Sequence, residues 1–147
     1  MKTNDLNDNL CPVATVLSAL NDKWTGLILR NLFLGKCKYN ELHQGSNITH
    51  STLSARLKML EGNGLIEKSL YQTGPDRYEY HLTNRGQDLI WVILAMTQVG
   101  RKWNVYNENT SPLKIINQET GNQVRLAVLD EINNEEIDLM QLGITAE

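Results

Sequence analysis

The segment from residue 46 to residue 82, SNITHSTLSARLKMLEGNGLIEKSLYQTGPDRYEYHL, constrains the fold most strongly. Its first part carries leucines with helical spacing, and its second part holds two β-rich runs joined by a Gly-Pro turn. Leu53, Leu57 and Leu60 lie at i, i+4 and i+7, so they form one apolar stripe that faces a core. The pattern predicts a short helix followed by a β-hairpin.

The opposite face of this helix is polar. Thr49 is a suitable N-cap, and Asn63 with Gly64 supplies a left-handed stop. Small polar side chains and a guanidinium can reach base edges in a DNA major groove. An ordinary amphipathic surface helix remains the alternative, and the hairpin that follows favours a winged helix-turn-helix. The predicted DNA-binding residues are Lys38, Thr49, His50, Ser51, Thr52, Ala55, Arg56 and Arg77.

The hairpin is predicted from residues 65–73 and 77–82, which flank the turn-forming group Thr-Gly-Pro-Asp. Arg77 follows the turn, where it can reach a minor groove or a phosphate. Upstream, residues 23–34 predict a helix that buries apolar side chains against the recognition helix. Residues 39–43 predict the first helix of the helix-turn-helix, with residues 44–47 as the turn. The buried side chains expected on the upstream helix are Trp24, Leu27, Ile28, Leu32 and Phe33.

Several motifs occur in order along the chain: CPV at 11–13, KWT at 23–25, LILRNL at 27–32, YNEL at 39–42, LSARLKMLEGNGLIEK at 53–68 and YEYHLTNRG at 78–86. With these motifs the chain resembles the HxlR family of bacterial transcriptional regulators, a branch of the MarR-like winged helices. The resemblance spans about residues 11–106. The resemblance implies a dimeric DNA-binding regulator that responds to a chemical signal, without identifying that signal. We expect the regulator to bind a specific DNA sequence and to be modulated either by an oxidant or electrophile that modifies Cys11 or by a small ligand.

Charge is divided unequally along the 147 residues. Residues 1–107 hold 12 Lys and Arg against 9 Asp and Glu, a net charge of +3, whereas residues 108–147 hold 2 against 8, a net charge of -6. The first part is therefore predicted to be the DNA-binding and dimerisation domain, with binding that weakens as salt rises. Residues 108–147 are predicted to be an acidic extension with two strands about a glycine turn, then a third short strand or a helical turn.

From Thr83 a long helix is predicted to run to about Tyr106. Its apolar residues are spaced by 3 and 4, as in a helix that packs along another helix. The apolar surface is broader than one neighbour covers, which predicts a symmetric dimer and a palindromic operator rather than a monomer. The whole chain is thus predicted to be mainly α with a small β-wing, an α+β fold. The predicted dimerisation residues are Leu89, Val92, Met96, Val99 and Trp103.

Two cysteines are candidates for a redox function. Cys11 precedes Pro12 and falls at a helix N-cap, where the helix dipole stabilises a thiolate, and Cys37 lies between Lys36 and Lys38. In some members of the resembled family a cysteine at the first position senses oxidants or electrophiles, and Cys11 matches it. Either Cys11 pairs with Cys37 of a partner subunit, or both cysteines are reduced thiols without a function.

Other chemistry is sparse in the sequence. The three histidines lack metal-ligand spacing, and no paired carboxylate, nucleophile elbow or phosphate-binding glycine loop occurs. We therefore expect no enzyme activity, no cofactor and no metal, with double-stranded DNA and a second copy of the chain as partners. No membrane segment or signal peptide is expected, so the expected location is the cytoplasm. Two alternatives are a winged helix used only for protein interaction and a thiol enzyme built on Cys11.

Overall fold

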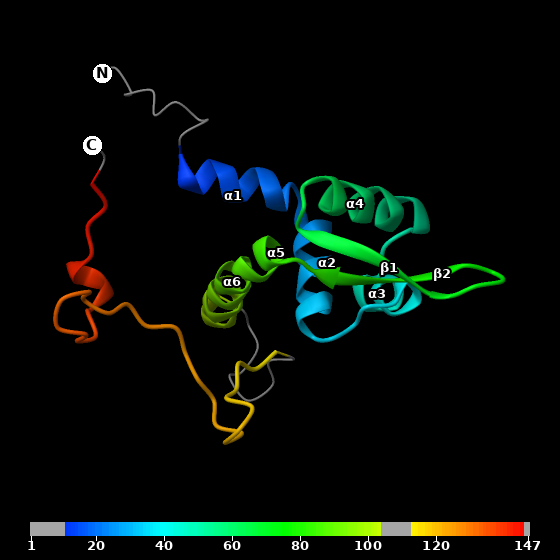
Figure 1. The fold of residues 1–147 in the computed structure, drawn as a ribbon. Helices are drawn as coiled ribbons and strands as arrows, with labels where there is room; N and C mark the ends of the chain where they lie inside the picture. Colours follow the sequence, from blue (N-terminus) through cyan, green and yellow to red (C-terminus); the bar gives the residue numbers. More distant parts are fainter. Residues whose placement is uncertain (1–10, 104–112, 146–147) are drawn as a thin grey trace, which may run out of the picture. The chain divides into compact units, whose positions relative to one another are not determined.

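The computed structural model describes residues 11–103 and 113–145 of the chain. These residues belong to two compact units, Met1–Ile93 and Leu94–Glu147, and the last helix crosses the division. The predicted domain boundary at residue 107 lies outside the described residues. Along the chain (Figure 1) the elements are α1 (Pro12–Leu20), α2 (Lys23–Phe33), α3 (Tyr39–Ser46), α4 (His50–Gly62), β1 (Ile66–Gln72), β2 (Arg77–Leu82), α5 (Asn84–Asp88), α6 (Ile90–Trp103) and the 3₁₀ helix η1 (Leu139–Gln141).

The predicted recognition helix is present as α4. The Thr49 hydroxyl accepts a hydrogen bond from the backbone N–H of Thr52 at 3.3 Å, which satisfies one of the unpaired donors at the helix start. The helix gives way to Asn63, and Gly64 takes the left-handed conformation with φ of 68°. All three leucines of the predicted stripe are buried, and burial of one leucine side chain contributes roughly 1.5–3 kcal/mol. The stripe therefore fixes which face of α4 points outward.

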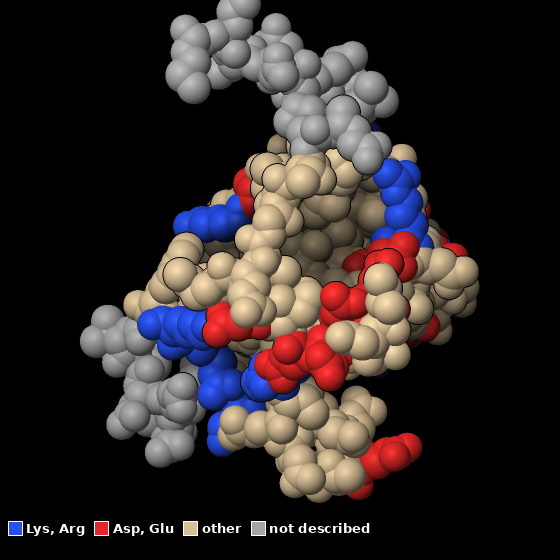
Figure 2. Space-filling model, turned by 90° about the vertical axis from the view of Figure 1, so that its left-hand side faces the viewer, with Lys and Arg blue, Asp and Glu red and all other residues tan. Residues whose placement is uncertain are grey.

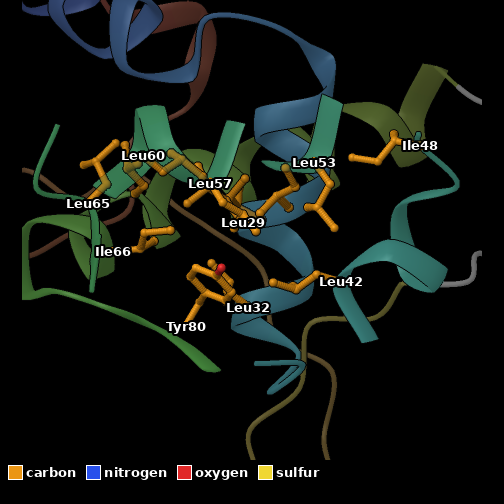
Figure 3. Close-up of a cluster of buried hydrophobic side chains, with 13 residues drawn as sticks. Leu29, Leu32, Leu42, Ile48, Leu53, Leu57, Leu60, Leu65, Ile66 and Tyr80 are labelled. Atoms are coloured by element: carbon orange, nitrogen blue, oxygen red, sulfur yellow. The ribbon is translucent and has the colours of Figure 1, made fainter. Parts of the chain in front are cut away.

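A single cluster of buried side chains lies beneath α4 (Figure 3). From α2 it takes Ile28 and Leu32 as predicted, and Leu29 in place of the predicted Leu27. Leu27 is half-buried and is not part of the cluster. Trp24 and Phe33 are also half-buried, and they pack against the edge of the cluster. Its other members come from α3, α4, the hairpin and the start of the last helix: Leu42, Ile48, Leu53, Leu57, Leu60, Leu65, Ile66, Tyr80, Leu89 and Ile93.

The first helix of the helix-turn-helix, α3, is longer than predicted. It continues through the predicted turn to Ser46, and Asn47 alone makes the turn with φ of 51°. The extra turn of helix is held by polar contacts with α2, because the buried Asn31 amide donates to the Ser46 hydroxyl at 2.9 Å. Arg30 also donates to the Gly45 carbonyl at 3.0 Å. These contacts set the position of α3 before the chain enters α4.

The predicted hairpin is present as the antiparallel pair of β1 and β2. Its register places Ile66 opposite Leu82 and Lys68 opposite Tyr80, with an irregularity near the turn. The buried Tyr80 packs on the core, while its neighbour His81 is exposed to solvent, in keeping with the alternation of side chains along a strand. The N–H of Tyr80 also donates to the Cys37 carbonyl at 2.8 Å, which attaches the segment before α3 to the hairpin.

The single long helix predicted from Thr83 is divided into α5 and α6. The Thr83 hydroxyl caps α5 as expected, by accepting from the Gly86 N–H at 3.1 Å. The two helices meet at Leu89, whose N–H donates to the Gly86 carbonyl at 3.2 Å in an i to i+3 bond that tightens the chain. The described part of α6 ends at Trp103, so the predicted end at Tyr106 lies outside the described residues.

The second unit contains the end of α6 and the C-terminal extension. The glycine turn is present, since the Gly121 N–H donates to the Asn117 carbonyl at 2.8 Å. The two predicted strands are reduced to isolated bridges, Ile116 with Gln123 and Leu129 with Glu136. One reason is that the backbone of Leu126, between these bridges, bonds to the Gln98 side chain of α6 instead of to another strand. Of the two predicted forms for the last element, the helical turn is observed, as η1.

Gly86 provides a test of the packing between α5 and the hairpin. A Cβ atom at this position overlaps the Leu65 carbonyl oxygen and lies 3.1 Å from a methyl group of Leu82. We expect Gly86→Ala to lower the free energy of unfolding by about 2–4 kcal/mol, because the backbone at Leu65 or in α5 must move to make room for the added methyl group. Urea unfolding of the variant measures this change. The control is Gly26→Ala in α2, where a Cβ meets nothing within 4 Å. The control is expected to be neutral or stabilising by up to about 1 kcal/mol, and an equal response of the two variants would contradict the packing argument.

Candidate nucleic-acid interface

The outward face of α4 is a strip of small polar side chains with one lysine. Because the leucine stripe is buried, the exposed positions fall on the opposite side of the helix. Ser54 and Lys58 belong to this strip, although the prediction did not assign Ser54 to DNA binding. Thr52 is half-buried at its edge. The exposed residues of the strip are His50, Ser51, Ser54, Ala55 and Lys58.

Tyr39 at the start of α3 supports the first turn of α4. Its hydroxyl lies 3.2 Å from Nδ1 of His50 and 3.0 Å from Oγ of Ser54, and it donates to the His50 carbonyl at 3.2 Å. The His43 ring stacks on the His50 ring with centroids 3.8 Å apart and an angle of 1° between planes. Tyr39 also packs against the edge of the core, and its polar contacts with α4 were not predicted from the sequence. His50 and Ser54 are four residues apart and so lie on one face of the helix, which is the pattern in the sequence that is consistent with a shared partner such as Tyr39.

Hydroxyl groups are also ordered at the N-terminus of α4. Thr49 Oγ1 donates to Thr52 Oγ1 at 2.9 Å and lies 3.1 Å from Ser51 Oγ. The backbone N–H groups of a first helical turn and the positive end of the helix dipole favour an anion such as a phosphate. Thr49, Ser51 and Thr52, three of the predicted DNA-binding residues, are therefore held together at the N-terminus of α4.

Arg56 is not available in the way the sequence predicted. Its guanidinium forms an ion pair with Asp22, with Nε at 2.7 Å and Nη2 at 2.6 Å from the same carboxylate oxygen. Both side chains are about three-quarters buried, at 28% and 27% exposed. In this structure the arginine therefore joins α4 to the start of α2, and the predicted base contact of Arg56 would require this ion pair to open. Asp22 lies 34 residues away, beyond what helical periodicity detects.

Asp22 has two structural roles. Its carboxylate caps α2 by accepting from the Thr25 N–H at 3.0 Å and the Thr25 hydroxyl at 3.1 Å, and it also binds Arg56. Burial on its own raises the pKa of the Asp22 carboxyl, but the hydrogen bonds from Thr25 and Arg56 outweigh burial and hold the pKa below its usual value. The ion pair is therefore formed at neutral pH.

The β-hairpin carries further cations. Arg77 is exposed at the start of β2, next to the turn, where the prediction put it. Lys68 lies over the Tyr78 ring at 4.2 Å, and Lys38 lies over the Tyr71 ring at 5.0 Å. These aromatic rings hold the amines close to the hairpin surface. Lys38 is exposed at the N-cap of α3, so it and Arg77 can both contact a polyanion.

Cys37 has a different environment from the predicted one. Its Sγ lies 3.9 Å from a carboxylate oxygen of Glu79 on β2, and its backbone N–H donates to Glu41 at 3.1 Å. Burial and the negative charges of Glu79 and Glu41 raise the pKa of the Cys37 thiol, and the positive charge of Lys38 offsets this only in part. The expectation that flanking lysines favour a thiolate at Cys37 is therefore wrong, because the fold brings two carboxylates to the sulfur.

Cys11 is the N-cap of α1, as predicted. Pro12 takes a first helical position, and the Cys11 carbonyl accepts from the N–H and the hydroxyl of Thr15 at 3.0 and 3.1 Å. The Cys11 side chain makes no capping hydrogen bond and is partly exposed. The Cys11 side chain is therefore neither fully buried nor used to cap the helix.

The predicted dimerisation residues divide into two groups. Leu89 is buried in the core of its own chain and Val92 packs against that core, so the assignment of Leu89 to a subunit contact is a correction. Met96, Val99 and Trp103 are exposed on α6, Trp103 at 83%. They lie at i, i+3 and i+7, which places them on one face of the helix. We call these three residues the α6 stripe.

Electrostatic attraction to DNA depends on where individual cations lie. Figure 2 shows a face on which basic and acidic side chains are interspersed among other residues. The net charge of +3 over residues 1–107 is modest. Exposed cations on or near the helix-turn-helix and the hairpin, which can reach phosphates, are Lys36, Lys38, Lys58, Lys68 and Arg77.

The described parts of the chain contain neither a cluster of metal-binding side chains nor a helix that could span a membrane. Within residues 11–103 and 113–145, no group of three or more His, Cys, Asp or Glu side chains is arranged to hold a metal ion. The helices in these same ranges are too short or too polar for any of them to span a bilayer.

The arrangement of α3, α4 and the two-stranded hairpin is that of a winged helix-turn-helix, a class of DNA-binding module. Residues 19–108 match the family model described as HxlR-like helix-turn-helix, and the chain belongs to this family. The chain is 36% identical over 96 residues to the HTH-type transcriptional regulator sll1512 of Synechocystis, and this match covers 65% of this chain and 71% of that relative. The chain is therefore a helix-turn-helix transcriptional regulator.

Solved structures share this fold. The crystal structure of PA1607, described as a candidate transcription factor, has a TM-score of 0.80 and 25% identity, and the match covers 94% of this chain and 96% of that one. The redox regulator HypR in its oxidised form has a TM-score of 0.57 and 30% identity, with 66% of this chain and 100% of that chain covered.

The Asp22–Arg56 ion pair predicts a pH-dependent contribution to stability. We expect Arg56→Ala to lower the free energy of unfolding at pH 7 by roughly 1–2 kcal/mol, since the capping carboxylate loses a charged partner. The pKa of Asp22 is depressed in the folded chain, so this contribution is complete above the ordinary carboxyl pKa of about 3.9 and decreases as pH falls below it. Urea unfolding at pH 7 and pH 3 measures it. Lys58→Ala, on the same helix but exposed, is the control, and an equal effect at the two pH values would contradict the ion pair.

The environment of Cys37 predicts slow modification of its thiol. At pH 7.5 Cys37 is expected to react with iodoacetamide several-fold more slowly than a free model thiol, because the nearby carboxylates disfavour the thiolate. Glu79→Gln removes one of these charges and is expected to speed the reaction and shift its pH profile to lower pH. Glu67→Gln, an exposed position on β1, is the matched control. Mass spectrometry of the modified peptide follows the rate, and an unchanged rate in Glu79→Gln would refute the electrostatic cause.

Proposed function

We propose that the protein is a sequence-specific transcriptional regulator that binds a palindromic operator as a homodimer. In this proposal the outward strip of α4 enters the major groove, and the hairpin contacts the adjacent phosphates or minor groove through Arg77. The activity is binding rather than catalysis, in keeping with the regulator assignments of its relatives.

One observation carries the DNA-binding part of the proposal. The strip of α4 is exposed and polar, while Tyr39 of α3 holds His50 and Ser54 in place from the side. Side chains that are positioned before binding lose less conformational freedom on contact with bases. His50, Ser51 and Ser54 are short enough to let the helix approach the groove floor, and serine can bond to any base edge.

The homodimer is supported by exposed apolar surface in both described units. The α6 stripe exposes Met96, Val99 and Trp103, and α1 exposes Val13 and Leu17. Several exposed apolar side chains on one face of a helix are a common mark of a subunit contact. A twofold axis pairs each surface with its own copy, and it sets two α4 helices about one DNA turn apart.

We also propose that Cys11 gives the regulator its response to oxidants or electrophiles. Support comes from the partial exposure of Cys11 at the start of α1 and from the similarity to HypR, which is a redox regulator. The exposed residues Val13 and Leu17 lie on the same short helix, so a modified Cys11 is placed close to a proposed subunit contact. A small ligand that binds elsewhere is the alternative effector.

Selection of duplex DNA from a random pool by the purified protein tests the proposal. We expect a palindrome with half-sites about 10–10.5 base pairs apart and affinity that falls steeply with salt. Ser54→Ala and His50→Ala are expected to weaken binding to the selected sequence about fivefold to a hundredfold, at roughly 1–3 kcal/mol per base contact. Arg77→Ala is expected to weaken all sequences alike and to reduce the salt slope by about 1. Ser18→Ala, exposed on α1, is the control.

The outcomes separate the alternatives. Failure to enrich any sequence would refute specific DNA binding and favour a protein-interaction module. Repeating the selection with diamide tests the oxidant response, which is expected to disappear in Cys11→Ser and to persist in Cys37→Ser. A response that persists in Cys11→Ser would refute the role of Cys11.

A further inference from the structure

The described part of the C-terminal extension carries many apolar side chains and buries none of them fully. Within residues 113–145 every described side chain is either exposed or half-buried. The segment, drawn from yellow to red in Figure 1, forms turns and isolated bridges instead of a sheet. Exposure of this much apolar surface to water is unfavourable. The large apolar residues that are most exposed there are Ile116, Leu129, Ile132, Leu139, Met140 and Ile144.

The backbone of the extension is nevertheless held in place. The Gln98 side chain of α6 binds Leu126 through two bonds: Nε2 donates to the Leu126 carbonyl at 3.2 Å, and the Leu126 N–H donates to Oε1 at 2.8 Å. Arg125 and Glu136 form a two-pronged ion pair at 2.7 and 2.9 Å. The apolar side chains therefore project from an ordered scaffold and do not belong to a random coil.

Two of these side chains are presented by the same local device. The Ile132 N–H donates to the Asp130 carboxylate at 2.8 Å, and the Met140 N–H donates to the Asp138 carboxylate at 2.9 Å. In each case the aspartate side chain accepts from the backbone N–H two residues further along the chain, which fixes a tight turn. Ile132 is 95% exposed and Met140 is 92% exposed, so each turn places one large apolar side chain almost wholly in solvent. We call Ile132 and Met140 the two apolar tips.

The same compact unit contains the α6 stripe. Successive residues of a helix are about 100° apart, so Gln98, which binds the extension, lies about 100° or more around α6 from Met96, Val99 and Trp103. The extension is thus attached to one side of α6 and leaves the stripe uncovered on another side. One unit of the chain therefore carries two sets of uncovered apolar groups, the α6 stripe and the apolar tips.

We propose that the apolar tips pack on a second copy of the chain, so that the extension is an intersubunit arm of the dimer. This rests on the proposed homodimer. A second copy is favoured because it continues the contact proposed for the α6 stripe, and because a twofold axis pairs the unit with its own copy. The net charge of -6 over residues 108–147 argues against DNA or an anionic membrane as the occupant. The match with PA1607 covers 94% of this chain, so the extension belongs to a shared architecture.

Sedimentation equilibrium of the full chain tests the arm. Ile132→Asp and Met140→Asp are each expected to raise the dimer dissociation constant at least about tenfold, because a charge in an apolar contact must be desolvated. Asn122→Asp adds the same charge at an exposed polar position of the extension and is expected to change the constant less than about twofold. Far-UV circular dichroism checks that each variant is folded.

Isotope-coded crosslinking identifies which chain the tips contact. One preparation, with nitrogen at natural abundance (¹⁴N), carries a photoreactive amino acid at position 132 or 140. It is mixed with wild-type chain that carries no photoreactive group and is grown in ¹⁵N. Crosslinks that join ¹⁴N and ¹⁵N peptides support the arm. Crosslinks confined to one isotope, or none while the wild-type protein is dimeric, overturn it and leave the dimer intact. A wild-type protein that sediments as a monomer overturns the homodimer itself, so the two failures are distinguishable.

Discussion

Burial of the leucine stripe of α4 is the constraint on which the rest of the structure depends. Leu53, Leu57 and Leu60 can leave water only if α4 lies on α2 with one face inward. Once that face is fixed, the geometry of the helix assigns every other residue of α4 to the edge or the outside. The polar strip is exposed because the leucines are covered. The packing of α4 therefore determines both the core and the proposed DNA-binding surface.

Polar contacts then fix the helix within that arrangement. Apolar packing alone allows a helix to rotate or slide by small amounts, whereas hydrogen bonds and ion pairs require defined geometry. Asp22 ties the start of α2 to Arg56 in the middle of α4, and Tyr39 of α3 holds the first turn through His50 and Ser54. Arg56, which the sequence predicted to contact a base, thus stabilises the scaffold in this structure, and Tyr39 both packs at the edge of the core and orders side chains on the surface of α4.

The two units of the chain place apolar groups differently. In the first unit most large apolar groups converge on a core, where Leu89 is inaccessible, although apolar side chains of α1 stay exposed. In the second unit, Trp103 and the apolar tips remain uncovered on a scaffold held by Gln98 and Arg125. Uncovered apolar side chains on an ordered backbone are the usual mark of an incomplete assembly. This contrast is the physical basis for treating the dimer and its arm as parts of one proposal.

The sequence by itself determined the features that depend on residues close together in the chain. The leucine stripe, the Thr49 and Thr83 caps, the Gly64 stop and the hairpin all follow from neighbours within a few positions, and all are present. Only the tertiary structure decided which charges meet and which apolar residues stay exposed. Arg56 meets Asp22 across 34 residues and Cys37 meets Glu79 across 42, and local periodicity carries no information about such partners. Exposure likewise depends on what the folded chain leaves uncovered, which is why Leu89 and Trp103, predicted together, have opposite environments.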